Sequence, residues 1–218
     1  RPNADAVDEQ AERVRLQPFF ELLATLRRRH PLMPLVSIDT RHASVARWAL
    51  ENGADWVNDV TGLVDTRMQE AVREKGAEAI AMHSLSVPVV PGESLDTTRR
   101  VELQLKDWLH ERRTAWEAAG LDCAKILFDP GVGFGKTALQ NLAIIRQTAL
   151  LRGLGFRLLV GHSRKSFMNS FAAQPFSERD TETLGLSLAM CEQGVDVIRV
   201  HDPIAHIRAY RAWSQART

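Results

Sequence analysis

Cysteine is scarce in this sequence, which holds two of them, Cys123 and Cys191, among 218 residues. They are far apart in the chain and form no CxxC spacing, so neither a zinc site nor a redox motif is indicated. Such low cysteine usage is typical of a reducing compartment. Because no signal-peptide pattern opens the sequence either, we expect a cytoplasmic protein.

The sequence also lacks an excess of charge and a long apolar run. Its 28 Lys and Arg residues nearly balance 27 Asp and Glu residues, which gives a formal net charge of +1. So small a charge produces no field that would attract nucleic acid or anionic lipid, and no segment has the length and apolarity of a membrane span. The 44% of hydrophobic residues suffices for a substantial core, and we expect one domain over residues 1–218.

A repeated pattern is present along the whole chain: a short apolar run rich in β-branched residues, then a longer amphipathic segment. The predicted strands are LVSIDT (35–40), DWVNDV (55–60), EAIAMH (78–83), KILFDPG (125–131), RLLVGHS (157–163) and VDVIRVHD (195–202). The predicted helices include 42–54, 95–120 and 138–155, several of them closed by glycine. This alternation predicts an α/β fold with a parallel sheet, either open and doubly wound or closed as a (β/α)8 barrel.

Polar residues at the ends of these strands favour the barrel. They are Asp39, Thr40, Asn58, Asp59, His83, Asp129, residues 162–165, Arg199 and His201. A barrel brings the carboxyl ends of all its strands to one face, whereas an open sheet uses mainly those near its switch point. Because the sequence shows about six strands instead of the eight of a barrel, we expect a (β/α)8 TIM barrel whose N-terminal two strands are absent from this chain.

The glycine-rich stretch DPGVGFGKT, residues 129–137, is not a nucleotide-binding loop. A P-loop needs a glycine five positions before Gly135, where Pro130 stands, and the third glycine of a dinucleotide fingerprint would fall on Lys136. The glycines instead suit a tight turn that lets a flat ligand approach the main chain.

Several polar residues have an ordinary structural explanation. Asp39, Asn58 and Asp59 follow strands, where they could cap the next helix, and for Asp59 capping and binding stay equally open. His83 is more easily explained as a hydrogen-bonded structural histidine than as a ligand-binding one.

Other residues indicate anion binding. GHSRKSF (161–167) is predicted to begin a helix directly after a strand, so its free N–H groups and its cations suit a carboxylate or phosphate. Arg199 and His201 alternate on one strand, point to the same side and can bind one anion together. Two carboxylates, a carboxamide and a lysine suit a heterocycle rich in donors and acceptors.

The motifs SIDT, GADWVNDV, AMH, DPGVGFGKT, LLVGHSRKSF and GVDVIRVHD, in this order and spacing, closely resemble those of the dihydropteroate synthase family. The resemblance implies a TIM barrel that condenses 6-hydroxymethyl-7,8-dihydropterin diphosphate with p-aminobenzoate and releases diphosphate in folate biosynthesis. It further implies a homodimer, a Mg²⁺ ion whose protein ligands lie on the missing N-terminal loop, and inhibition by sulfonamides.

The resemblance also assigns roles to residues, with Asp39, Asp129, Lys165, Arg199 and His201 as the catalytic set. The residues matched to the pterin ring are Asp39, Asn58, Asp129 and Lys165, and those matched to the diphosphate are Arg199 and His201. The p-aminobenzoate is expected beside Phe134 and Lys136, with its carboxylate at Ser166. Arg1 would belong to a mobile second loop.

Three departures from the family pattern keep alternatives open. The family's first loop and the part of the second loop before Arg1 are not on this chain. The segment SLSVPVV follows AMH, and His162 stands where the family usually has an apolar or small residue. A pterin-binding methyltransferase, which needs neither the SRKS nor the RVHD motif, and a non-catalytic pterin-binding paralogue are the alternative hypotheses.

Overall fold

One parallel six-stranded sheet forms the centre of the computed structural model, which describes residues 7–30, 32–172 and 174–217. The strand order is β1-β2-β3-β4-β5-β6, and every neighbouring pair is parallel. The strands are β1 Ser37–Asp39, β2 Trp56–Asp59, β3 Glu78–Met82, β4 Ile126–Asp129, β5 Arg157–Val160 and β6 Val197–Ile198. All six predicted strands are therefore confirmed, as is the α/β class.

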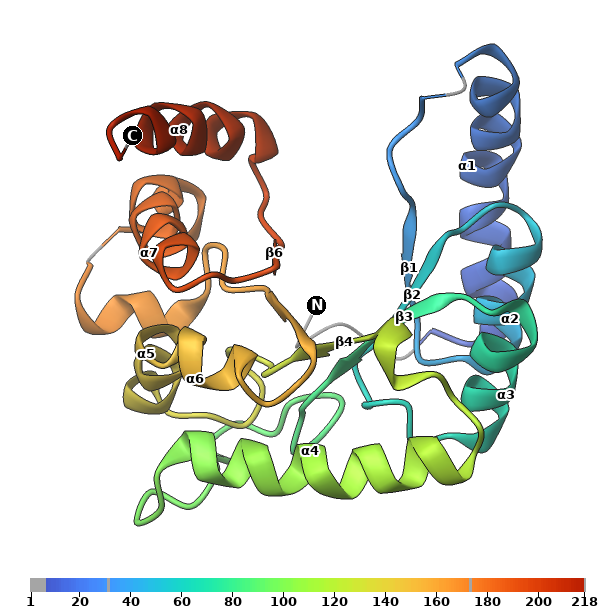
Figure 1. Cartoon of the computed structure of the whole chain (residues 1–218). Helices are drawn as coiled ribbons and strands as arrows, with labels where there is room; N and C mark the ends of the chain where they lie inside the picture. Colours follow the sequence, from blue (N-terminus) through green and yellow to red (C-terminus); the bar gives the residue numbers. More distant parts are fainter. Residues whose placement is uncertain (1–6, 31, 173, 218) are drawn as a thin grey trace.

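Helices connect consecutive strands and cover one face of the sheet (Figure 1). They are α1 Glu9–Arg29, α2 Ala43–Glu51, α3 Thr66–Lys75, α4 Val101–Ala118, α5 Ala138–Arg146, α6 Thr148–Arg152, α7 Asp180–Glu192 and α8 Pro203–Gln215.

Two helix predictions were wrong in detail. The segment 138–155 is not one helix: Gln147 has φ −107° and ψ 23°, and the hydroxyl of Thr148 bonds the carbonyl of Ile145 at 2.9 Å, which competes with continuous helical bonding. The segment after β5 does not begin an α-helix either. Arg164 has φ 58°, which turns the chain, and a five-residue 3₁₀ helix follows at Ser166–Ser170.

The two faces of the sheet bury different residues, as the alternation of side chains along a strand requires. Val57, Phe128 and Leu158 belong to the main core beneath the helices. Ile80 and Leu127 face the other side and form, with Leu159, a small separate cluster against which Trp56 and Val197 pack. This second face is the one that a barrel would enclose.

The sheet is open between its first and last strands. Within the described part of the chain β1 and β6 are at opposite ends of the strand order and do not pair, so a closed six-stranded barrel is not found. Figure 1 shows β1 beside α1 at one side of the molecule and β6 beside α7 and α8 at the other. The expected unpaired edges are thus observed, while the absence of two further βα units from this chain stays a prediction.

The helices of the described ranges were also examined for membrane spans. Over residues 7–217, leaving out 31 and 173, no helix unites the length and the apolarity that crossing a bilayer would require.

The start of α5 allows a test of how the end of the glycine-rich stretch 129–137 is held. Thr137 caps the helix with a reciprocal capping box: its hydroxyl accepts from the Gln140 N–H, and the Gln140 side chain accepts from the Thr137 N–H. We predict that Thr137→Ala lowers the free energy of unfolding by about 1 kcal/mol. Thr114→Ala, at an exposed position inside α4, serves as the control and should be neutral or slightly stabilising. Urea unfolding of both variants measures the difference, and equal stabilities would show that the cap contributes nothing.

Candidate active site

The polar residues predicted from the strand ends lie at one edge of the sheet. Asp39, Asp59 and Asp129 are the last residues of β1, β2 and β4, and Arg199 directly follows β6. Because all strands are parallel, their carboxyl ends share this edge, which is where α/β proteins build their ligand sites.

An ion pair joins the two ends of the sheet. Arg199 Nη1 lies 3.0 Å from Asp39 Oδ2, although the residues are 160 positions apart in sequence. Both side chains are about half exposed, at 43% and 57%, so the pair contributes no more than about 1 kcal/mol to stability. Its significance is geometric, because it brings a residue matched to the pterin within bonding distance of one matched to the diphosphate.

Asp129 is 2% exposed and lies at the start of the glycine-rich loop. Its Oδ1 accepts the Gly131 N–H at 2.8 Å, and its backbone carbonyl accepts the His83 N–H at 2.9 Å. Burial raises the pKa of Asp129, against the opposing effects of the Lys165 charge and the Gly131 N–H. Gly131 has φ 67°, and a Cβ there would lie 1.9 Å from the His83 carbonyl oxygen, so this turn requires glycine.

Lys165 reaches across to the same loop. Its ammonium donates to the Val132 carbonyl and lies 4.8 Å from the centroid of the Phe134 ring, a cation–π distance. Burial lowers the pKa of Lys165 to about 8, while the charge of Asp129 acts in the opposite direction. The loop thus brings the carboxylate at the end of β4 and an amine from the turn after β5 into one largely buried region.

The amine of Lys136 is directed into the protein. It lies 3.0 Å from His83 Nδ1 and donates to the Phe134 carbonyl at 2.9 Å. Burial lowers the pKa of Lys136 to about 7, and burial together with the Lys136 charge lowers the pKa of His83 to about 3. His83 is therefore neutral and accepts from Lys136, and its ring packs edge-on against Trp108 at 5.2 Å. This geometry agrees with the structural explanation of His83, whereas contact of Lys136 with a second substrate stays a prediction.

Arg199 and His201 both contact the end of β5. The backbone N–H of Arg199 donates to the Val160 carbonyl at 3.0 Å, and the guanidinium lies over Gly161, where a Cβ would come within 3.1 Å of Nε. His201 donates its backbone N–H to Ser163 Oγ at 3.2 Å, and its Nδ1 lies 2.8 Å from the same oxygen. Ser163 was not among the predicted site residues. It is the first residue of the SRKS motif and lies among the polar strand-end residues 162–165, which was the available signal.

The structure distinguishes the neighbouring residues Asn58 and Asp59. Asn58 is 4% exposed, and its Oδ1 has no hydrogen-bond partner among the described atoms, as expected of an acceptor that awaits a ligand. The carboxylate of Asp59 instead accepts from the N–H and hydroxyl of Thr61 and from the N–H of Leu63. Asp59 therefore stabilises the turn after β2.

Two further predicted site residues are less well defined by the structure. Ser166 is exposed and is the first residue of the 3₁₀ helix. Arg1 lies outside the described residues.

In the described ranges, no group of three or more His, Cys, Asp or Glu side chains could hold an ion. The residues present do not fit a Mg²⁺ site built from protein side chains alone.

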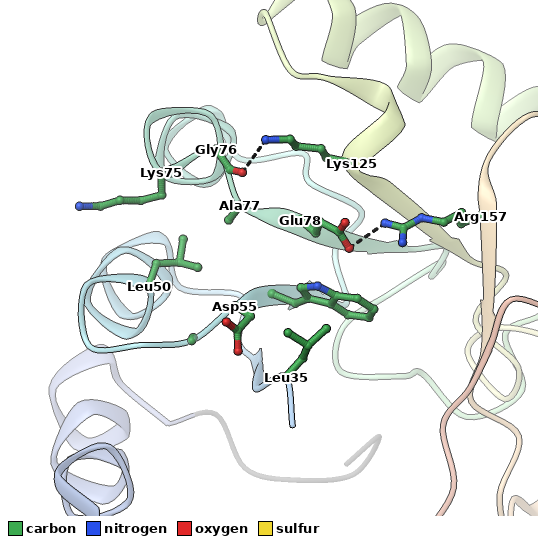
Figure 2. Close-up of a pocket in the computed structure, with 11 residues that line it drawn as sticks. Leu35, Leu50, Asp55, Lys75, Gly76, Ala77, Glu78, Lys125 and Arg157 are labelled. Atoms are coloured by element: carbon green, nitrogen blue, oxygen red, sulfur yellow. Dashed lines mark hydrogen bonds and ion pairs between the residues drawn. The ribbon is translucent and has the colours of Figure 1, made fainter. Parts of the chain in front are cut away.

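A cavity of about 580 Å³ lies at the other end of the strands. Its lining includes Trp56, Glu78 and Arg157, the first residues of β2, β3 and β5. Figure 2 shows the Arg157 guanidinium directed at Glu78, at 2.7 Å, and the Lys125 amine directed at the Gly76 carbonyl, at 2.8 Å. These charges are already paired and lie away from the residues of the carboxyl edge, so we do not assign the active site to this cavity.

Comparison with known proteins identifies the family of this chain. A family model described as pterin binding enzyme matches residues 1–201, so the chain belongs to the pterin-binding enzyme family. The dihydropteroate synthase of Synechocystis is 34% identical over 206 residues, covering 93% of this chain and 68% of that protein. Within the pterin-binding enzymes, the similarity is to the dihydropteroate synthases.

Solved structures give the same result. Anaplasma phagocytophilum dihydropteroate synthase with bound 6-hydroxymethylpterin-monophosphate has a TM-score of 0.87 and 32% identity, over 97% of this chain and 84% of that one. Xanthomonas albilineans dihydropteroate synthase with 4-aminobenzoic acid has a TM-score of 0.88 and 29% identity, over 100% and 76%.

The chain spans a smaller part of some longer relatives. It is 38% identical to a probable bifunctional folylpolyglutamate synthase/dihydropteroate synthase of Haloferax volcanii, of which it covers 24%.

The buried amine of Lys136 predicts a specific pH dependence of stability. Its pKa falls from 10.5 to about 7 on folding, so between these values the unfolded chain binds more protons than the folded one. The free energy of unfolding should therefore rise with pH from about 7 to 10.5, by at most about 1.4 kcal/mol per pH unit from this group. Below that window both states carry the proton, and the slope vanishes.

Lys136→Met should flatten this rise, and urea unfolding at several pH values between about 6 and 10 measures it. Lys106→Met, at an exposed position in α4, is the matched control and should keep the slope of the unsubstituted protein. An unchanged slope in Lys136→Met would contradict a buried amine.

Proposed function

We propose that this chain carries the activity of dihydropteroate synthase. It joins the methylene carbon of 6-hydroxymethyl-7,8-dihydropterin diphosphate to the amine of p-aminobenzoate and releases diphosphate. One observation supports this proposal most: two sets of polar groups lie at the same edge of the sheet. One is the buried Asp129 with the unpartnered Asn58 oxygen, and the other is Arg199 with His201.

In this proposal Asp129 and Asn58 accept hydrogen bonds from the donor groups of the pterin, and Lys165 donates to its acceptors. A carboxylate that is already buried needs no further desolvation when the flat ring covers it, and Gly131 and Gly133 let the ring approach the main chain. Asp39 adds a second carboxylate beside the ring, at the point where the ring meets Arg199.

The reaction breaks the bond between the methylene carbon and the diphosphate oxygen, and the electron pair leaves on the diphosphate. Arg199 and His201 stabilise this developing charge, which is the largest electrostatic demand of the step. The aniline nitrogen of p-aminobenzoate then bonds the carbon and loses its proton to the leaving group or to water. Aniline is a neutral nucleophile at pH 7, so no strong general base is needed.

Magnesium is a further proposal. A Mg²⁺ ion would supply additional positive charge to the diphosphate, as it commonly does with one or two carboxylates and several phosphate oxygens. Because the described residues do not fit a site of their own, no step above uses it. Addition of Mg²⁺ to the assay below tests whether it is required.

Two proposals concern assembly. The sheet would be part of a (β/α)8 barrel whose two further strands lie outside this sequence, which the unpaired edges of β1 and β6 support.

The homodimer is supported by apolar side chains exposed on α8, where Ile204, Ile207 and Tyr210 are 69%, 52% and 49% exposed.

The release of diphosphate tests the activity. We expect release from the pterin diphosphate to depend on p-aminobenzoate and to fall at least about 100-fold in Arg199→Ala, because the loss of a charge-assisted contact to the leaving group costs about 2–4 kcal/mol. Arg208→Ala, which removes an exposed arginine from α8, is the control and should leave the rate unchanged. Release independent of p-aminobenzoate would exclude the synthase reaction, and its absence would favour the methyltransferase or the non-catalytic paralogue.

The pterin-binding role of Asp129 has a separate test. Asp129→Asn should abolish binding of 6-hydroxymethylpterin without unfolding the protein, because the amide opposes an N–H to a ring donor, at a cost of about 1–3 kcal/mol or more. Calorimetry measures the affinity, and circular dichroism verifies the fold. Asp107→Asn, in an exposed ion pair with Arg99, is the control. Unchanged affinity in Asp129→Asn would remove this residue from the site.

A further inference from the structure

One serine joins two histidines behind the Arg199–His201 pair. Ser187 of α7 is 2% exposed, and its Oγ lies 3.1 Å from Nε2 of the fully buried His162 and 3.0 Å from Nε2 of His206 on α8. The proposed reaction uses none of the three. The partners of these groups allow their hydrogen atoms to be assigned, although His162 Nδ1 has no partner among the described residues.

The assignment follows from the carbonyl groups at the ends of the chain. His162 Nε2 also lies 3.0 Å from the Thr183 carbonyl, which can only accept, so this nitrogen carries a hydrogen. His206 Nδ1 lies 2.7 Å from the Asp202 carbonyl and carries a hydrogen for the same reason. A neutral His206 then accepts at Nε2 from the Ser187 hydroxyl. The single Nε2–H of His162 is shared between the Thr183 carbonyl and Ser187 Oγ.

The chain also stays satisfied when His206 gains a proton. His206 Nε2 then donates to Ser187 Oγ, and the hydroxyl hydrogen turns to the Thr183 carbonyl at 2.8 Å. Rotation of one hydroxyl is the whole adjustment. The His162–Ser187–His206 chain is therefore a connection that holds in either protonation state.

Both ends of this chain are attached beside the anion-binding pair. His162 lies between Gly161, over which the Arg199 guanidinium lies, and Ser163, which bonds His201. At the other end, His206 bonds the carbonyl of Asp202, the residue that follows His201.

Few apolar contacts hold the segment from β6 to α8 in place. β6 has two residues and pairs with β5 alone among the described strands, and α8, described over its whole length, buries none of its residues. Figure 1 shows α8 beside α7 at the end of the sheet where β6 lies. A two-residue strand and a surface helix give Arg199 and His201 few apolar contacts, so polar contacts define their position. The hydrogen-bonded chain adds to the direct bonds of these two residues with Val160 and Ser163.

We propose that His162, Ser187 and His206 are positioning residues for the diphosphate-binding pair Arg199 and His201, an inference that rests on the proposed function. The chain fixes the distance between the end of β5 and the turn from β6 into α8. Its effect should fall mainly on the anion, because the pterin-facing Asp129 and Asn58 belong to β4 and β2, away from this chain. Lys165 follows His162 closely, but its amine is held by the Val132 carbonyl of the glycine-rich loop.

The test compares two probes by calorimetry: inorganic diphosphate and free 6-hydroxymethylpterin. We expect Ser187→Ala and His206→Ala to weaken diphosphate binding by about 3- to 10-fold, the range for loss of a neutral hydrogen bond that acts through a neighbour. Pterin affinity should not change. His206→Gln should recover most of the loss, because its amide can reach Ser187 as donor or acceptor. Ser214→Ala, a partly exposed serine of α8 whose hydroxyl bonds the Arg211 carbonyl, is the matched control and should bind both probes normally.

The outcomes separate this inference from the proposed function. If the unsubstituted protein does not bind diphosphate, the proposed function fails and this inference fails with it. If it binds while both alanine variants bind equally well, the inference alone is overturned. Equal weakening of both probes also overturns it, because the chain would then only stabilise the fold. His206→Ala decides the matter should Ser187→Ala not fold, since His206 lies near the surface.

Nitrogen NMR of the imidazoles provides an independent measurement. We expect the Nε2–H tautomer for His162 and the Nδ1–H tautomer for neutral His206. The opposite tautomer in either residue contradicts the assigned hydrogen bonds.

Discussion

Burial of charge at one edge of a parallel sheet is the constraint on which the rest of the site depends. Asp129, Lys136 and Lys165 are each withdrawn from water, and burial moves the pKa of each toward its neutral form. The protein offsets this with hydrogen bonds from the glycine-rich loop to each charge. The Gly131 N–H meets the carboxylate, and the carbonyls of Val132 and Phe134 meet the two amines.

This arrangement explains the backbone of the loop. A backbone that supplies an N–H to one side chain and carbonyls to two others within four residues must reverse direction repeatedly, and Gly131, Gly133 and Gly135 all have positive φ. The loop that resembles a phosphate-binding sequence is thus shaped by the need to satisfy its own buried charges.

The strands and the edge of the sheet that holds the site were predictable from sequence, because apolar runs ending in polar residues reflect strand direction directly. The direction of the Lys136 side chain was not, since a lysine in a loop carries no periodicity that shows whether it points to solvent or to His83. The break at Gln147 was missed because the apolar pattern continues across it. His162 was noticeable in the sequence only because the family usually has an apolar or small residue at this position. Its partners Ser187 and His206 come from helices whose relative placement no local sequence feature specifies.

In the Arg199–Asp39 ion pair, the Asp39 carboxylate competes with any anionic ligand for the Arg199 guanidinium. The Asp39 carboxylate already bonds one nitrogen of the guanidinium. The binding free energy that an anion gains at Arg199 is therefore the difference between its own attraction to the guanidinium and that of Asp39. For a singly charged anion such as chloride this difference is close to zero. A multiply charged group gains more, so the pair favours anions of high charge density over singly charged ones, by no more than the roughly 1 kcal/mol that a half-exposed ion pair is worth. Displacement of Arg199 would in turn leave the Asp39 oxygens available to hydrogen-bond donors of the same ligand, which couples the anion half of the site to the half that faces the ring.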